Sequence, residues 1–118
     1  MSRVNREPPS FVRGSEFLVS VFGEWPSFHD FEIISLYLVR VGISHIIVTE
    51  PGGGQEIRFE MESIEDLELI DFSHQNVVYG IDFEHAEDES VTIRLSPSFG
   101  LCGWIRARVV SAAFVKRD

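Results

Sequence analysis

Apolar and polar residues alternate along much of the chain after residue 30. The clearest example is EIRFEME at 56–62, in which Ile57, Phe59 and Met61 alternate with charged residues. A period of two predicts an antiparallel strand with one buried face and one solvent face. The same kind of pattern predicts further strands at 66–72, at 77–84, around 91–95, and around 104–110 with a continuation to Val115.

Residues 31–41, FEIISLYLVRV, are apolar on both faces near the middle of the run. Continuous apolar character is typical of a strand covered on both sides, so this run predicts the central strand of the sheet. Gly42 ends it, and ISHIIVT at 43–49 predicts a second strand that pairs back on it. Pro51 and the glycines at 52–54 then predict a hairpin turn.

A helical periodicity precedes the strands. SEFLVSVF at 15–22 predicts a short helix that Ser15 caps and that Gly23 ends in a left-handed conformation. The preceding residues 1–14 include two consecutive prolines and predict an arm without regular structure. The residues predicted to share the apolar face of the helix are Phe17, Leu18, Val21 and Phe22.

Together these elements predict an α+β fold, mainly an antiparallel β-sheet with one short N-terminal helix packed on it. A chain of 118 residues is long enough for one hydrophobic core and too short for two. We therefore expect an N-terminal arm over residues 1–14 and a single antiparallel domain over residues 15–118.

The net charge of −9 is unevenly distributed along the chain. Residues 41–93 hold thirteen of the nineteen carboxylates and one basic residue, Arg58, which gives this segment a net charge of 1 − 13, or −12. Because negative charge repels phosphate, we expect no direct nucleic-acid partner. The other nine basic residues lie toward the two ends of the chain.

The N-terminal residues are polar and contain no apolar stretch that would serve as a secretion signal or a membrane span. We therefore expect a cytoplasmic protein without membrane contact. Cys102 is the only cysteine, which excludes an intrachain disulfide and a cysteine-based zinc site. No base stands near Cys102 in the sequence to hold it as a thiolate, so we expect a buried, inert thiol.

Residues 25–33, WPSFHDFEI, raise the question of a catalytic or metal site. The four histidines of the chain lie near carboxylates, yet none of the spacings matches a zinc motif. We therefore predict no catalytic residue, no metal and no cofactor. The alternative prediction is a small ligand-binding, metal-binding or hydrolytic domain that uses His29, Asp30, Asp71 and His74.

The carboxylates of the predicted strands suggest a binding surface instead. If 56–62, 66–72 and 77–84 are neighbouring strands, their outward carboxylates share one face, where like charges destabilise one another. A solvated face is one interpretation, and electrostatic recognition of a basic partner is the other. The predicted partner-binding residues are Glu56, Glu60, Glu62, Asp66, Glu68, Asp82 and Glu84.

Five phrases follow one another along residues 15–112: a helix ending in FG, WPSFHDFEI, IRFEM, DLELIDFSHQNVVYGIDF and SFGLCGWIRARVV. In that order they resemble the immunity protein 50 family, which comprises predicted immunity proteins of bacterial polymorphic toxin systems. The HD and HQNV phrases are the most distinctive parts of the resemblance. We predict structural roles for the residues of these motifs, which are Trp25, His29, Asp30, His74, Gln75 and Asn76.

The resemblance implies a cytoplasmic protein, not an enzyme, that binds and neutralises a cognate toxin domain. It names no particular toxin and transfers no catalytic residue. Combined with the acidic segment, it leads to the hypothesis of a cationic toxin, such as a nuclease, docked on the acidic face. A homo-oligomer whose Phe-rich surfaces meet across a two-fold axis is a further alternative.

Overall fold

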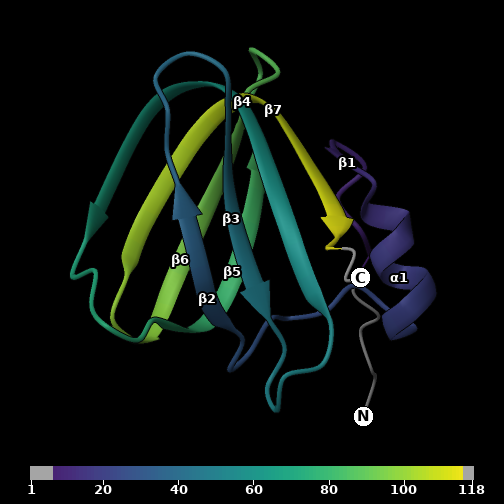
Figure 1. The fold of residues 1–118 in the computed structure, drawn as a ribbon. Coiled ribbons are helices and arrows are strands. Elements are labelled where there is room, and N and C mark those ends of the chain that lie inside the picture. The colour runs from purple at the N-terminus through teal and green to yellow at the C-terminus, as the bar shows by residue number, and fades with distance from the viewer. Residues whose placement is uncertain (1–6, 116–118) are drawn as a thin grey trace, which may run out of the picture.

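Seven strands and one short helix make up the computed structural model, which describes residues 7–115 (Figure 1). The strands form a mostly antiparallel sheet on which the helix packs, so the predicted α+β class is confirmed. The elements are β1 (Val12–Arg13), α1 (Ser15–Phe22), β2 (Glu32–Tyr37), β3 (Ile43–Thr49), β4 (Glu56–Ile70), β5 (Val77–His85), β6 (Val91–Phe99) and β7 (Cys102–Phe114).

The sheet closes on itself. Its strands follow the order β1-β7-β4-β3-β2-β5-β6, and an additional pairing of β6 with β7 completes the ring. The joint between β2 and β5 is the shortest, with Glu32 opposite Val77 as its one register pair. Only β1 runs parallel to its neighbour, β7. Closure leaves every long strand with one face toward a common interior and one toward solvent.

Aromatic rings fill one part of that interior. The ring of Phe59, on β4, lies 5.5 Å from Phe28 and 5.3 Å from Phe83 of β5. Trp25 contacts the same two rings at 5.5 and 5.7 Å. The segment that leads into β2 therefore contributes core residues, because its aromatic side chains insert among those of the sheet.

The helix has the predicted bounds, Ser15–Phe22, and ends at Gly23. Gly23 adopts a left-handed conformation and donates its N–H to the carbonyl of Val19 at 2.8 Å, as predicted. Gly14 occupies the N-cap position, and the Ser15 hydroxyl instead donates to the carbonyl of Pro9. The predicted capping role of Ser15 is therefore wrong.

The buried face of α1 also differs from the prediction. Leu18 is fully buried and Phe22 packs on the rings of Phe31 and Phe114, whereas Phe17 and Val21 are 61% and 52% exposed. The helix lies beside the C-terminal end of β7 (Figure 1), so only one narrow stripe of its surface meets the sheet. Within residues 7–115, no helix is both long and apolar enough to span a membrane.

The predicted central strand at 31–41 is wrong. β2 covers only Glu32–Tyr37, and it pairs fully with β3 but at a single register position with β5. Ile33 is buried, while Tyr37 and Val41 are 52% and 81% exposed. An apolar run on both faces predicts two covering layers; here the second layer is missing and apolar side chains face solvent.

Two predicted strands, 56–62 and 66–72, are halves of the single strand β4. The register of β4 against β7 shifts between Ile64 and Asp66, so a β-bulge at Glu65 joins the two predicted strands into one. The strand at 43–49 and the turn after it form as predicted, and the predicted strands at 77–84, 91–95 and 104–110 each form and extend further.

The predicted arm contributes to the sheet. Val12 is 1% exposed, and β1 pairs in parallel with Val110 and Ser111 of β7. Residues 1–6 of the predicted arm and residues 116–118 of the predicted domain lie outside the described residues.

Candidate functional site

The sheet order separates the predicted acidic face. β4 has β3 and β7 as neighbours, whereas β5 lies between β2 and β6, so the condition under which the seven carboxylates would share one face is not met. Two strands intervene on either side of the ring. Five of the predicted carboxylates lie on β4, namely Glu56, Glu60, Glu62, Asp66 and Glu68, and two lie on β5, namely Asp82 and Glu84.

Arginines of the intervening strands partly neutralise these carboxylates. Glu84 accepts a 2.8 Å hydrogen bond from Nε of Arg94 on β6, and Asp66 lies 3.8 Å from Nη2 of Arg106 on β7. On β4 itself, Arg58 lies 3.6 Å from Glu60. The acidic surface is therefore interrupted by positive charge from the C-terminal strands.

Three of the predicted carboxylates have no ion pair with any described residue: Glu62, Glu68 and Asp82. All three residues are exposed to solvent. Their negative charge is therefore available to a partner approaching the outer face of the sheet.

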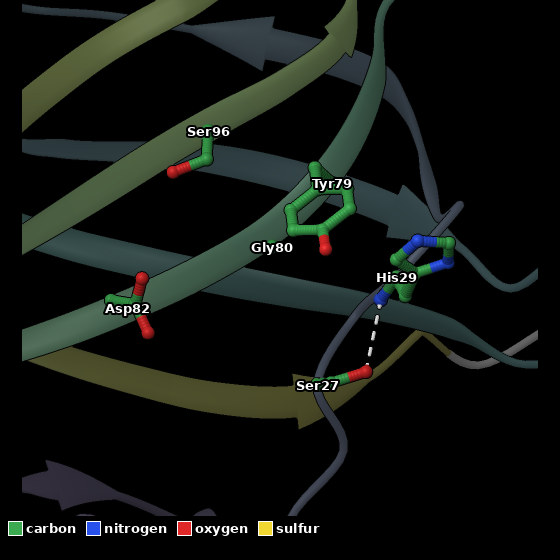
Figure 2. A pocket seen from close by; sticks show the side chains of 6 residues that line it. All are labelled: Ser27, His29, Tyr79, Gly80, Asp82 and Ser96. Atoms are coloured by element: carbon green, nitrogen blue, oxygen red, sulfur yellow. Dashed lines mark hydrogen bonds between the residues drawn. The ribbon is translucent and has the colours of Figure 1, made fainter.

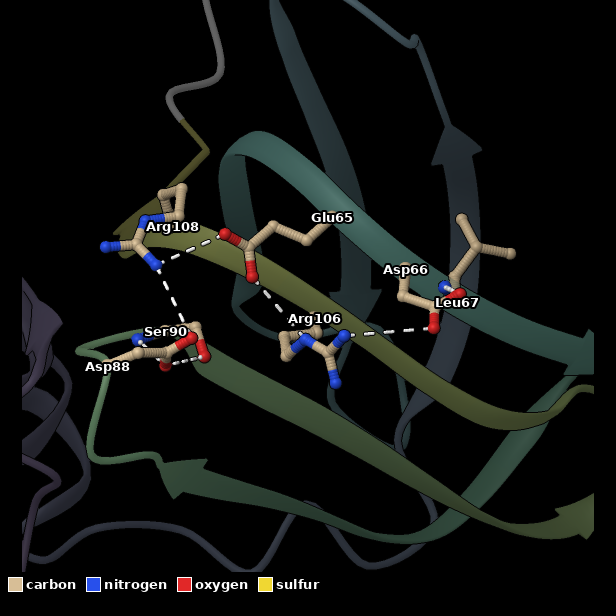
Figure 3. Close-up of polar contacts among 7 residues, drawn as sticks. All are labelled: Glu65, Asp66, Leu67, Asp88, Ser90, Arg106 and Arg108. Atoms are coloured by element: carbon tan, nitrogen blue, oxygen red, sulfur yellow. Dashed lines mark hydrogen bonds and ion pairs between the residues drawn. The ribbon is translucent and has the colours of Figure 1, made fainter.

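The bulge in β4 places Glu65 at the centre of an ion-pair cluster (Figure 3). Its two carboxylate oxygens lie 3.5 Å from Arg106 and 3.2 Å from Arg108, and Arg108 also reaches Asp88 at 3.7 Å. Hydrogen bonds from Ser90 hold the pKa of Asp88 below its ordinary value, and the two arginines act in the same direction. The pairs are partly exposed, so each contributes little to stability.

Sequence reasoning missed this cluster. Arg106 and Arg108 stand two residues apart in β7, which is the spacing of side chains on one face of a strand. That alternation was a usable signal for a basic stripe beside the acidic strand. The bulge that turns Glu65 toward both arginines leaves no comparable mark in the sequence.

A second polar cluster lies on the outer face of β2, β3 and β4. His45 Nε2 lies 3.2 Å from the Ser35 hydroxyl, and the imidazole stacks on Tyr37 at 5.4 Å between ring centroids. Partial burial lowers the pKa of His45, the charge of Arg58 lowers it further, and Glu60 acts in the opposite direction. His45 was not among the predicted site residues, because nothing in its local sequence marks the neighbours that β-pairing supplies.

An open hollow of about 400 Å³ lies over β5 (Figure 2). The imidazole of His29 meets the ring of Tyr79 edge to face at 4.8 Å between ring centroids, and the backbone N–H of His29 donates to the Ser27 hydroxyl at 3.3 Å. Asp82 lies further along the same strand as Tyr79. The hollow is lined by Ser27, His29, Tyr79, Gly80, Asp82 and Ser96.

The HD phrase is positioned by backbone geometry. Asp30 has a φ of 66° and donates its N–H to the carbonyl of Val78 at 2.9 Å, so the phrase is tied to β5. His29 Nδ1 lies 3.2 Å from the Asp30 carboxylate, and both side chains are more than half exposed. Trp25 is 6% exposed and belongs to the core.

In the HQNV phrase, Asn76 is buried and makes the structural hydrogen bonds. Its Oδ1 accepts hydrogen bonds from the backbone N–H groups of Ser73 and Leu101 at 3.0 and 2.8 Å, and its Nδ2 donates to the Ser73 carbonyl. Gly100, at φ 88°, permits this approach, because a Cβ there would lie 2.5 Å from the Asn76 oxygen. Asn76 thus ties the loop before β5 to the turn before β7.

The neighbouring residues of the phrase face solvent. His74 and Gln75 are exposed, and His74 Nδ1 lies 3.3 Å from the Ser73 hydroxyl. Asp71 is also exposed and has a φ of 62°. Neither imidazole of the two phrases hydrogen-bonds to a backbone group within residues 7–115, so the anchoring in this region comes from Asn76.

The residues proposed for a hydrolytic or metal site are His29, Asp30, Asp71 and His74. The first two contact each other, as described above, and the last two lie in the loop between β4 and β5. Across residues 7–115, no three histidine, cysteine, aspartate or glutamate side chains are close enough together to hold a metal ion.

Cys102 begins β7 and is half-buried rather than fully buried as predicted. It lines a second hollow of about 300 Å³, together with Trp104 of β7 and Glu68 and Ile70 of β4. Ser96 belongs to both hollows, so the two adjoin on the outer face of the sheet.

Comparison with known proteins found no matching family model, no matching curated protein and no matching solved structure. The site geometry and the sequence phrases described above are therefore the basis from which a function is inferred.

Proposed function

We propose that this chain is an immunity protein that binds and neutralises a cognate bacterial toxin in the cytoplasm. Two independent features support the proposal. One is the resemblance of five ordered sequence phrases to the immunity protein 50 family. The other is the charge on the outer face of the sheet, which suits recognition of a basic protein.

The outward carboxylates without an ion pair are the observation on which the proposal chiefly rests. Glu68 and Asp82 are exposed, have no ion pair with a described residue, and belong to a chain of net charge −9. Exposed negative charge accelerates association with a cationic partner and orients it on approach. A toxin that acts on nucleic acid has the required positive surface, because its own site must attract phosphate.

Protection of living cells tests this function. The toxin to use is the C-terminal domain of a secreted protein whose gene adjoins that of this chain, produced from an inducible promoter in a sensitive bacterium. We expect co-expression of this chain to restore growth. Growth arrest despite normal amounts of both proteins would contradict the proposal.

A matched pair of charge reversals adds specificity to that assay. Asp82→Lys changes an outward carboxylate of the sheet, and Glu16→Lys makes the same charge change on the helix. We expect Asp82→Lys to reduce protection and Glu16→Lys to preserve it. Equal protection by both variants would show that toxin neutralisation does not depend on the acidic sheet surface.

A further inference from the structure

The hollow over β5 includes a glycine, Gly80, in its lining. Gly80 lies at its base, and a Cβ built on Gly80 would meet the Ser27 carbonyl at 3.8 Å and no other atom more closely. The absence of a side chain at this position therefore opens the hollow. Its volume of about 400 Å³ falls within the range of roughly 300 to 1,000 Å³ that is usual for small-ligand sites.

The walls of the hollow combine one carboxylate with two aromatic rings. Among residues 7–115, Asp82 is the only acidic residue of the lining, and no lysine or arginine of this range contributes to it. Tyr79 is 62% exposed and is contacted at its ring by His29 (Figure 2). The hydroxyl groups of Ser27 and Ser96 provide further hydrogen-bond acceptors at the rim.

The arginine opposite Asp82 in the sheet forms its ion pair with another carboxylate. Arg94 stands opposite Asp82 in the register of β5 and β6, but its Nε donates to Glu84 at 2.8 Å. That charge-assisted bond directs the guanidinium toward the neighbouring outward carboxylate. Asp82 consequently keeps its charge available in a hollow bounded by aromatic surface.

We propose that this hollow binds an arginine side chain of a protein partner. The Asp82 carboxylate accepts hydrogen bonds from the guanidinium, whose flat face stacks on Tyr79. Arginine fits better than lysine, because its planar group can make both contacts at once. The Ser27 and Ser96 hydroxyls then accept from the remaining N–H groups.

The occupant belongs to a protein rather than being free in solution, because the hollow continues into another one. The two hollows share Ser96, and the second presents apolar surface from Ile70, which is 54% exposed, and Trp104, with Glu68 and Arg94 also in its lining. A segment with arginine in the first hollow therefore continues across Ser96 onto apolar surface. The inference rests on the proposed function, since the toxin is the partner that would supply the arginine.

A small probe tests the hollow without a toxin. We would titrate the whole protein with N-acetylarginine amide and follow amide shifts of Tyr79, Gly80 and Asp82 by NMR. N-acetylcitrulline amide is the control, because it has the same shape without the charge. We expect saturable shifts with the arginine compound at concentrations on the order of 100 mM or below, and at least tenfold weaker binding of the citrulline compound.

Two variants separate charge from space. Asp82→Asn should weaken binding of the arginine probe about fivefold or more, since it removes the exposed ion pair. Gly80→Leu should abolish binding by filling the hollow, and the φ of Gly80 is not among the positive values, so the side chain is tolerated. Glu16→Gln, on α1, removes a carboxylate elsewhere and should leave binding unchanged.

The outcomes distinguish this inference from the proposed function. Equal binding of citrulline and arginine, shifts confined to other residues, or an unaffected Asp82→Asn variant would overturn the arginine site even if the protein protects cells. Selective binding that Asp82→Asn weakens would support the site even if the protection assay fails.

Discussion

The two halves of β4 differ in their neighbours. From Glu56 to Glu62 the strand pairs with β3 on one edge and β7 on the other, whereas from Ile64 to Ile70 its register pairs are with β7 alone. The inward residue Phe59 is 1% exposed in the first half, and Leu67 is 38% exposed in the second. The Leu67 N–H donates to the Asp66 side chain at 2.9 Å.

The difference shows how similar sequence patterns acquire different roles. Both halves alternate apolar and acidic residues, so both predict a half-buried strand. Neighbours on both edges make the first half part of the core. The second half has one edge without a partner strand among residues 7–115 and contributes to surface features, including the ion-pair cluster and the hollow that Glu68 lines. We therefore assign stability chiefly to the first half and partner recognition to the surface beside the second.

The largest difference should appear when one apolar residue is removed from each half. Phe59→Ala should lower the free energy of unfolding by about 3 to 5 kcal/mol, because it opens a cavity among packed rings. Leu67→Ala should cost about 1 kcal/mol, because the residue is already partly in solvent. Urea unfolding measures both, with Phe59→Leu as a substitute if the alanine variant does not fold. Equal losses in the two halves would contradict the comparison.

The loop that follows the second half depends on Asn76. Asn76→Ala would leave two backbone N–H groups, of Ser73 and Leu101, without their acceptor. We expect a loss of about 2 to 4 kcal/mol in the free energy of unfolding. His74→Ala is the matched control from the same phrase and should change stability by less than about 0.5 kcal/mol, because His74 is exposed. A larger effect for His74 would reverse our assignment of the anchoring residue.

A smaller effect is expected from the charges at the bulge. Glu65→Gln removes the carboxylate shared by Arg106 and Arg108 and should cost at most about 1 kcal/mol of unfolding free energy at low salt. The loss should shrink as salt is added, because the pairs are partly exposed. Thermal unfolding at two salt concentrations provides the measurement. A salt-independent loss of several kcal/mol would show that the bulge is held by these charges and not by strand pairing.

The smallest effect is on the pKa of His45, which lies beside the charged residues Arg58 and Glu60 in the first half of β4. Burial and then Arg58 lower the pKa of His45 from its ordinary value of 6.5, while Glu60 raises it. Arg58→Gln should therefore raise the pKa of His45, and Glu60→Gln should lower it further. NMR titration of the imidazole protons gives both values. Shifts in the same direction for the two variants would contradict the proposed environment.

The same depressed pKa fixes the sign of a pH effect on stability. Below pH 6.5 the unfolded chain takes up the proton on His45 before the folded chain does. The contribution of His45 to stability is therefore complete above pH 6.5 and declines as the pH falls toward the lower folded-state pKa. Replacing His45 with Gln should flatten this part of the stability profile.

The alternation of apolar and polar residues predicted where the strands lie better than it predicted which strands are neighbours in the sheet. Alternation identified 56–62 because an inward face must be apolar wherever the partner strands lie. The same reasoning placed 66–72 in a separate strand and left the neighbours of each strand open, because a bulge and the closure of a sheet depend on distant residues. The prediction of a central strand at residues 31–41 was wrong for a related reason, since the apolar outer side chains of this segment are exposed rather than covered.

The candidate site was predictable only in part. The excess of carboxylates between residues 41 and 93 is visible in the sequence, and Glu62, Glu68 and Asp82 remain without an ion pair to a described residue. The interruption by Arg94 and Arg106 was not predicted, because those residues lie in strands that the fold inserts between the acidic ones. Likewise, the hollow assembles Ser27 and His29 beside Asp82 only through tertiary packing.

The central claim is that a cationic toxin binds the acidic outer face of the sheet, and association kinetics with the purified toxin domain test it most directly. We predict a one-to-one complex whose association rate falls with added salt. The rate should fall about tenfold or more for the double variant Glu68→Lys and Asp82→Lys, and little for Glu16→Lys. The absence of a complex, or a rate indifferent to salt and to the double reversal, would contradict the claim.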